Sequence, residues 1–280
     1  MRLLRKQPEI YPARLVLMGI PYDANSSFLP GTAEAPPLIR QALFSPATYL
    51  WTEELIDLGQ PGILDDAGDL DLAPGMDVNN EIEVAITNLL NSERVPIVLG
   101  GDHSITYPIV RALRRVHQKL SLLQFDAHPD LYLEFEGNRY SHACPFARIM
   151  EEKLVDQLVQ VGIRAMDDHE LNQARNFGVK MITMSEWKLD YDVRLENPVY
   201  ISFDVDSLDP AFAPGVSHRE PGGLSVRDVL EVIQTITVPI VGADIVEFNP
   251  RQDPVGLTAP VCAKLAKELA GKILGCTGRE

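Results

Sequence analysis

The chain has 280 residues, enough to bury a substantial core in one large domain or in two small ones. It carries 25 Lys and Arg against 40 Asp and Glu, which gives a formal net charge of −15. This acidic balance argues against the basic stripe of a nucleic-acid-binding domain and against a polybasic membrane-binding surface.

Seven short apolar runs rich in Val and Ile predict strands that are buried on both faces. In chain order these runs cover residues 15–19, 95–100, 120–126, 158–162, 179–184, 199–204 and 238–244. Helical periodicity lies between them, over residues 81–90, 225–236 and 257–274. The alternation predicts an α/β fold with three layers, α/β/α, around a mostly parallel central sheet. No repeat or linker divides the chain, so we expect a single domain over residues 1–280.

The cysteines and the N-terminus bear on the cellular compartment. Cys144, Cys262 and Cys276 are too few and too scattered for a disulfide framework, and their odd number suits a reducing compartment. Residues 1–8 have basic side chains but lack the apolar segment of a secretory signal. No apolar run approaches the 18 residues needed to cross a membrane. These observations predict a cytoplasmic protein without a membrane partner.

Polar clusters follow three of the predicted strands, at the points where those strands end. The chain reads GGDHS over residues 100–104, DAHPD over residues 126–130 and DVD over residues 204–206. In open parallel sheets, ligands bind beyond the carboxyl ends of the strands. We therefore expect the three clusters to lie close together.

The residue types in these clusters predict a site for two metal ions. An i, i+2 spacing in extended backbone places side chains on one face, about 7 Å apart. Several carboxylates crowded in this way repel one another unless cations neutralise them. Carboxylate-rich ligation without thiols favours Mn²⁺, and two such ions can activate a hydroxide nucleophile. The predicted ligands are His103, Asp126, His128, Asp130, Asp204 and Asp206.

The sequence resembles the ureohydrolase family, which includes arginases, agmatinases and related guanidino-acid hydrolases. The resemblance rests on GGDHS at 100–104, DAHPD at 126–130, SFDVDSLDPAFAPG at 202–215 and DIVEFNP at 244–250. It implies an arginase-like fold, two Mn²⁺ ions, and hydrolysis of a guanidino C–N bond to urea and an amine. It also implies a homo-oligomer, either a trimer or a hexamer.

The resemblance further assigns roles to individual residues. One Mn²⁺ would be held by His103, Asp126, Asp130 and Asp204, and the other by Asp126, His128, Asp204 and Asp206. Glu247 would pair with the guanidinium of the substrate, and His142 would relay a proton to the leaving amine. Catalytic roles are thus expected for Asp130, His142 and Glu247.

The loop over residues 131–142 bears on the identity of the substrate. It is similar to agmatinase loops, so we expect an agmatinase-like enzyme with a small cationic guanidino substrate. Substrate contacts in the loop are expected from Asn138, Arg139 and His142, in addition to Glu247. Glu134 and Glu136 could meet a distal ammonium, whereas Arg139 could instead meet a distal carboxylate.

Other interpretations stay open at this point. A guanidino-acid hydrolase resembling guanidinobutyrase, an arginase or a formimino-group hydrolase would use the same metal ligands. Glu247 favours a cationic guanidinium, because a neutral amide gains nothing from a buried carboxylate. A non-catalytic binding protein is least favoured, since every inferred ligand is present. Cys144 is expected to serve packing.

Overall fold

The computed structural model describes residues 14–188 and 193–277, so residues 1–8, considered above, lie outside the described part. Within that part, eight parallel strands form one sheet in the order β2-β1-β3-β8-β7-β4-β5-β6. The strands are β1 (Arg14–Ile20), β2 (Leu64–Asp69), β3 (Arg94–Gly100), β4 (Ser121–Phe125), β5 (Gln157–Ile163), β6 (Lys180–Thr183), β7 (Val199–Asp204) and β8 (Ile240–Val246).

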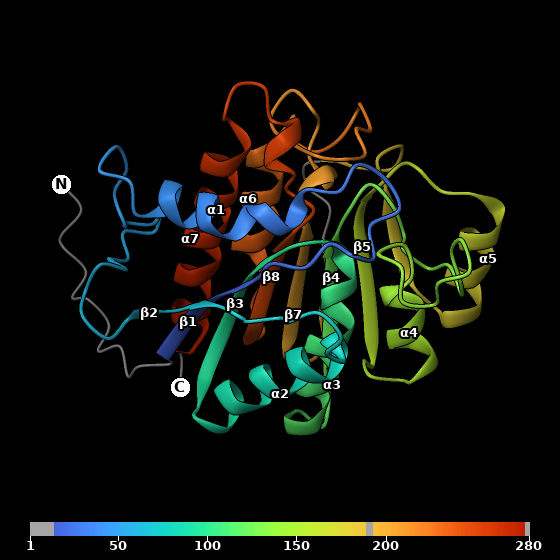
Figure 1. Cartoon of the computed structure of the whole chain (residues 1–280), viewed down its shortest axis with the longest axis horizontal. Helices are drawn as coiled ribbons and strands as arrows, with labels where there is room; N and C mark the ends of the chain where they lie inside the picture. The colour runs from blue at the N-terminus through green and yellow to red at the C-terminus, as the bar shows by residue number, and fades with distance from the viewer. Residues whose placement is uncertain (1–13, 189–192, 278–280) are drawn as a thin grey trace.

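Helices cover both faces of this sheet (Figure 1). The α-helices are α1 (Ala35–Leu43), α2 (Val78–Asn91), α3 (Thr106–Val116), α4 (Pro145–Glu151), α5 (Asp168–Phe177), α6 (Val226–Thr235) and α7 (Thr258–Thr277). Short 3₁₀ helices are η1 (Thr32–Glu34), η2 (His103–Ile105), η3 (Val205–Ser207) and η4 (Pro250–Gln252). One buried apolar cluster packs α1, α6 and α7 against one face of the sheet. A second cluster packs α2, α3, α4 and α5 against the opposite face. The predicted three-layer α/β/α fold is confirmed.

Alternating residues of the central strands face opposite layers. In β4, Leu123 and Phe125 belong to the apolar cluster under α1, α6 and α7, while Leu122 belongs to the other cluster. Burial on both faces explains why these strands are continuous apolar runs in the sequence. The sequence patterns do not predict β2, because this edge strand is the largely polar and partly exposed segment LDDAGD.

The four strands that precede the sequence motifs are neighbours in the middle of the sheet. β3, β8, β7 and β4 lie side by side, and all of them run parallel. Phe125 pairs with Phe203, and Asp204 pairs with Val246. The residues that follow these strands are therefore brought to one edge of the sheet.

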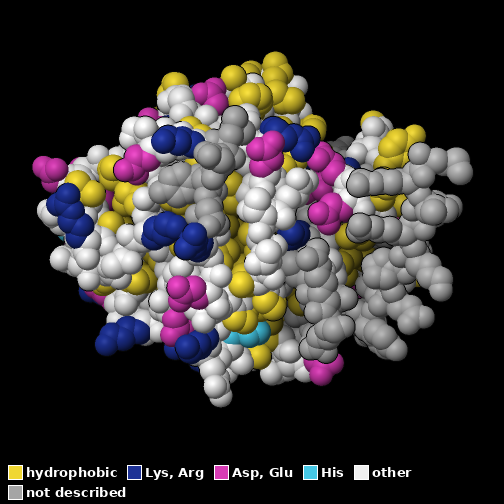
Figure 2. Space-filling view, turned by 180° about the vertical axis from the view of Figure 1, so that it is seen from behind, with side chains coloured by type: hydrophobic (Ala, Val, Ile, Leu, Met, Phe, Trp, Pro, Cys, Tyr) yellow, Lys and Arg dark blue, Asp and Glu magenta, His cyan; other side chains and the backbone are white. Residues whose placement is uncertain are grey.

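The surface carries charges of both signs. Figure 2 shows acidic and basic side chains interspersed over the back of the molecule, with no continuous basic stripe on the described part of that face. Among the described helices, none combines the length and the apolar character that crossing a bilayer requires. Cys144 and Cys262 are both buried with free thiols.

Candidate metal centre and substrate cavity

The predicted metal ligands meet beyond the carboxyl ends of β3, β4 and β7. Two groups of side chains each bring their ligand atoms within 4.8 Å of one another. The first group contains His103, Asp126 and Asp130, and the second contains Asp126, His128 and Asp206. Because Asp126 belongs to both groups, its carboxylate could bridge two cations.

A buried imidazole nitrogen marks the centre of the first group. His103 Nδ1 lies 3.1 Å from Asp126 Oδ2, 3.0 Å from Asp130 Oδ2 and 3.2 Å from Asp204 Oδ2. This nitrogen has no hydrogen-bond partner among the described residues. Buried polar atoms are normally paired, so an unpaired nitrogen facing three carboxylates fits a cation site.

The other ring nitrogen of His103 fixes the tautomer that a metal needs. His103 Nε2 lies 2.9 Å from Ser202 Oγ, and Ser202 Oγ donates to Asp244 Oδ1 at 2.7 Å. Since Ser202 gives its only proton to Asp244, it accepts a hydrogen bond from Nε2–H. Nδ1 then carries the lone pair and points at the carboxylates, as in metal-binding histidines.

The second group is held by backbone amides and by an amide side chain. His128 Nδ1 lies 3.1 Å from Asp206 Oδ2 and 3.5 Å from Asp126 Oδ1. Asp206 Oδ1 accepts a hydrogen bond from Ala127 N at 3.1 Å. Asp126 accepts from His128 N at 2.7 Å and from Gln124 Nε2 at 2.7 Å. These bonds orient the carboxylates toward one another despite their shared charge.

The electrostatics of the centre also fit two cations. Burial, together with the charge of Asp126, raises the pKa of Asp130 to about 6. Burial, together with the charge of Asp206, raises the pKa of Asp204 well above its ordinary value. Divalent cations would remove this repulsion and keep the carboxylates ionised. A donor set of carboxylates and imidazoles without thiols suits Mn²⁺ and similar ions.

Two site residues have a positive φ, a backbone conformation that residues other than glycine rarely adopt. Asp130 has φ of 52° and Glu247 has φ of 64°. Such residues cost about 1–3 kcal/mol each and cluster at functional sites. Here the left-handed backbone turns each carboxylate inward directly after a strand or a strand-end loop.

Glu247 and His142 form a buried pair beside the metal centre. Glu247 Oε1 accepts hydrogen bonds from His103 N at 2.9 Å and from His142 Nδ1 at 3.0 Å. Burial acts to raise the pKa of Glu247, but the charge of His142 holds it below its ordinary value. Burial acts to lower the pKa of His142, but the charge of Glu247 raises it to about 9.

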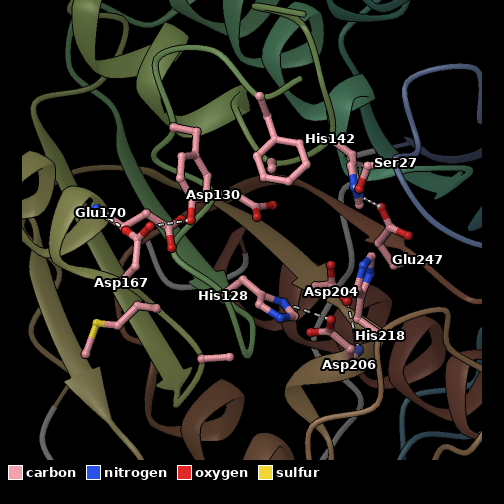
Figure 3. A pocket seen from close by; sticks show the side chains of 15 residues that line it. Ser27, His128, Asp130, His142, Asp167, Glu170, Asp204, Asp206, His218 and Glu247 are labelled. Atoms are coloured by element: carbon pink, nitrogen blue, oxygen red, sulfur yellow. Dashed lines mark hydrogen bonds and ion pairs between the residues drawn. The ribbon is translucent and has the colours of Figure 1, made fainter. Parts of the chain in front are cut away.

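A cavity of about 270 Å³ opens next to this pair and the metal ligands (Figure 3). It is lined by His128, Asp130, Asp204 and Asp206, and by His142 and Glu247. Figure 3 shows Asp167 and Glu170 on the opposite side from Glu247, with His128 between them. The cavity therefore has an acidic group at each end.

The sequence patterns miss several residues of the cavity lining. Asp167 and Glu170 come from the start of α5, where Asp167 also caps the helix by accepting from Glu170 N at 3.0 Å. His218 lies with its ring centroid 5.7 Å from that of His128 and 5.5 Å from that of His142. Its position three residues beyond the 202–215 motif is the one sequence signal that could have indicated it.

Two of the predicted substrate contacts lie outside the cavity lining. Asn138 Nδ2 donates to Asn25 Oδ1 at 3.0 Å, so Asn138 joins two loops. Arg139 has a side chain that is 56% exposed and pairs with Glu151 at 3.0 Å. The acidic residues of the same loop are also exposed, namely Glu134 and Glu136. The loop instead contributes Tyr132 and Phe135 to the lining.

Comparison with known sequences places these features in a family. The model of the arginase family matches residues 13–271. The mitochondrial arginase 1 of Arabidopsis thaliana is 48% identical over 275 residues, which cover 92% of this chain and 80% of that protein. The N(1)-aminopropylagmatine ureohydrolase of Thermus thermophilus is 38% identical over 283 residues, covering 96% of this chain and 94% of that protein.

Solved structures give the same result. The arginase of Medicago truncatula superposes with a TM-score of 0.87 at 44% identity, covering 92% of this chain and 87% of that chain. The proclavaminate amidino hydrolase of Streptomyces clavuligerus superposes with a TM-score of 0.84 at 32% identity, covering 96% of this chain and 95% of that chain. The arginase-like fold implied by the sequence motifs is thus confirmed.

These comparisons favour the alternative to one prediction and correct another. The agmatinase-like prediction rested on one loop, whereas identity over the whole chain, 48% against 38%, supports the arginase alternative better. The cytoplasmic prediction is contradicted, because similar plant arginases are named as mitochondrial or chloroplastic. The small number of cysteines indicates a reducing compartment and does not separate the cytosol from an organelle. This chain belongs to the arginase family of metal-dependent hydrolases acting on guanidino and amidino groups.

Proposed function

We propose that this chain hydrolyses the guanidino group of L-arginine to urea and an amine, with two Mn²⁺ ions as cofactors. The observation that carries this proposal is the carboxylate of Glu247, which is 5% exposed and lines the same cavity as the candidate metal centre. A guanidinium ion pairs with such a carboxylate in a planar, bidentate geometry. The likeness to plant arginases supports arginine as the substrate.

The residues of the cavity provide binding and proton transfer. When bound, a pair of divalent cations lowers the pKa of water enough to supply hydroxide near neutral pH. Glu247 would hold the guanidinium so that its carbon faces the metal centre. As the bond to the alkyl nitrogen breaks, His142 would give that nitrogen a proton, and the attacking water would replace the proton. One guanidinium ion and one water molecule thus give urea and one protonated amine.

The far end of the cavity suits an ammonium group. Asp167 Oδ2 accepts a hydrogen bond from Tyr132 OH at 2.8 Å, which orients the carboxylate. Neither Lys nor Arg is present among the described residues of the lining. The α-ammonium of arginine would therefore meet Asp167, and its carboxylate would lie toward the open mouth.

Steady-state kinetics on three guanidino compounds test this proposal. We expect arginine to have a kcat/KM at least about tenfold above those of agmatine and 4-guanidinobutyrate. Asp167→Asn should lower kcat/KM about tenfold for arginine and agmatine, which carry an ammonium, but not for guanidinobutyrate. Arg139→Ala is the matched control and should change none of the three values. Absence of urea with every compound, with metal bound, would overturn the proposal.

The absence of Lys and Arg from the described lining favours a second candidate substrate. A guanidino amine that lacks a carboxylate, such as agmatine, would leave no anion unpaired in this cavity. Preference for agmatine in the same assay would establish this alternative. The homo-oligomer and the single domain over residues 1–280 remain proposals, which sedimentation and limited proteolysis would test.

A further inference from the structure

Ser27 belongs to the loop between β1 and η1, and it contacts the cavity residue His142. Ser27 Oγ lies 2.8 Å from His142 Nε2. The other ring nitrogen, Nδ1, lies 3.0 Å from Glu247 Oε1. Carboxylate, imidazole and hydroxyl thus form one hydrogen-bonded row, and all three side chains line the cavity (Figure 3).

The row determines which nitrogen of His142 exchanges its proton. An ionised carboxylate only accepts hydrogen bonds, so Nδ1 keeps its hydrogen beside Glu247 in both charge states of the ring. Nε2 is then the nitrogen that gains and loses a proton, and Ser27 is its partner. The His142 side chain is buried, whereas Ser27 is exposed. The hydroxyl therefore connects a buried imidazole to the open side of the cavity.

The loop that carries Ser27 is fixed against the site on two sides. Asn25 N donates to Asp102 Oδ2 at 2.9 Å, next to the ligand His103. Asn25 O accepts from His142 N at 3.2 Å, so the backbone of His142 is tied to the same loop. Ser27 is thus held at His142 by contacts beyond its own side chain.

We propose that Ser27 is a positioning residue for His142 that also relays its proton. The inference rests on the proposed hydrolysis of a guanidino group. Ser27 Oγ accepts the proton of Nε2 while its own hydroxyl proton moves to the leaving nitrogen, as the C–N bond breaks. The ring ends neutral and the hydroxyl is restored, so one proton has been transferred in total.

Kinetics of two substitutions at this position and one beside it test the proposal. Ser27→Ala should lower kcat about tenfold with little change in KM, because the relay is lost while the guanidinium site remains. Ser27→Thr should restore kcat, since it returns the hydroxyl. Ser26→Ala is the matched control, because the Ser26 hydroxyl has no hydrogen-bond partner among the described residues. Wild-type kcat in Ser27→Ala would overturn the proposal.

A spectroscopic measurement separates this inference from the proposed function. In ¹⁵N NMR spectra of the manganese-free protein, Ser27→Ala should shift the Nε2 resonance of His142, and Ser26→Ala should not. An unchanged resonance would overturn the inference even if the wild-type protein is active. If the wild-type protein makes no urea, the proposed function fails, while the resonance still reports the Ser27–His142 hydrogen bond.

Discussion

The side chains that orient the metal ligands lie one contact away from them. Asp244 is fully buried and accepts hydrogen bonds from Ser202, Thr106 and Tyr200 at 2.7 Å, 2.9 Å and 2.9 Å. Three hydroxyl donors compensate this carboxylate for its loss of water. Ser202 then presents an acceptor to His103, so the geometry of the centre depends on residues that no ion would contact.

Removing the Ser202 hydroxyl should weaken metal binding. In Ser202→Ala, His103 Nε2–H loses its buried acceptor, and the tautomer with its lone pair on Nδ1 is no longer favoured. Loss of such a partner typically costs about 10–100-fold in metal affinity. Competition with a chelating dye would measure the Mn²⁺ affinity, with the exposed Ser185→Ala as control. An unchanged affinity would contradict the role of Ser202.

Individual site residues differ in how far sequence could indicate them. The structure brings the six predicted ligands together because they follow neighbouring strands within short motifs. Asp167, His218 and Ser27 come from three separate loops, and their side chains converge only after folding. Arg139 shows the opposite case, because its charge suggests a substrate contact but its side chain pairs with Glu151.

At the scale of elements, the loop that follows β1 packs tightly against the loop that follows β3, next to the site. Gly101 N donates to Ile20 O at 3.1 Å, and Asp102 N donates to Tyr22 O at 2.8 Å. A Cβ atom added at Gly101 would lie 1.7 Å from Tyr22 O, a backbone atom that cannot move aside alone. This glycine allows the loop with Ser27 to pack against the GGDHS motif.

Gly101→Ala should therefore separate the two loops. We expect a destabilisation of about 1–3 kcal/mol, typical of overpacking, and loss of most urea production because the ligand and relay loops both shift. Thermal unfolding and a urea assay measure the two effects. Gly275→Ala in α7 is the control, since its Cβ would meet no atom closer than 4.0 Å. A Gly101→Ala protein with wild-type melting and activity would refute this account.

Helices and strands also differ in how well the sequence predicts them. The seven predicted strands are all present. The central strands are buried on both faces and mostly apolar, whereas β6 at the sheet edge is only partly buried. The helix over 225–236 is present as α6, and a capping box between Ser225 and Asp228 stabilises its start. Helices α1, α3, α4 and α5 lie outside the predicted helical ranges. In α1, Pro36 and Pro37 stand in the first turn, where proline is tolerated.

For the whole molecule, the net charge of −15 includes four aspartates among the metal ligands. Two divalent cations would offset these four charges, and a formal charge of −15 + 4 = −11 would remain. The metal centre thus accounts for a small part of the acidic balance. The rest would favour the approach of a cationic substrate at low ionic strength.

Metal binding should make the stability of the whole chain depend on pH in a characteristic way. The pKa of Asp130 is about 6 in the folded protein against an ordinary value of 3.8, so the folded state holds a proton that the unfolded state releases. Without metal, stability should therefore fall as the pH rises from about 4 to 6. Bound metal requires the deprotonated carboxylates, so its stabilisation should grow over the same range.

Thermal melts at pH 4, 5, 6 and 7, with Mn²⁺ and with a chelator, measure this linkage. The increase in Tm on adding Mn²⁺ should be small at pH 5 and several degrees at pH 7, since ligand at 100 times its Kd contributes about 2.7 kcal/mol. In Asp130→Asn the amide cannot hold or release this proton, so the metal-free protein should lose less stability between pH 4 and 6. An increase in Tm that is equal at every pH would show that protons do not compete with the metal for these carboxylates.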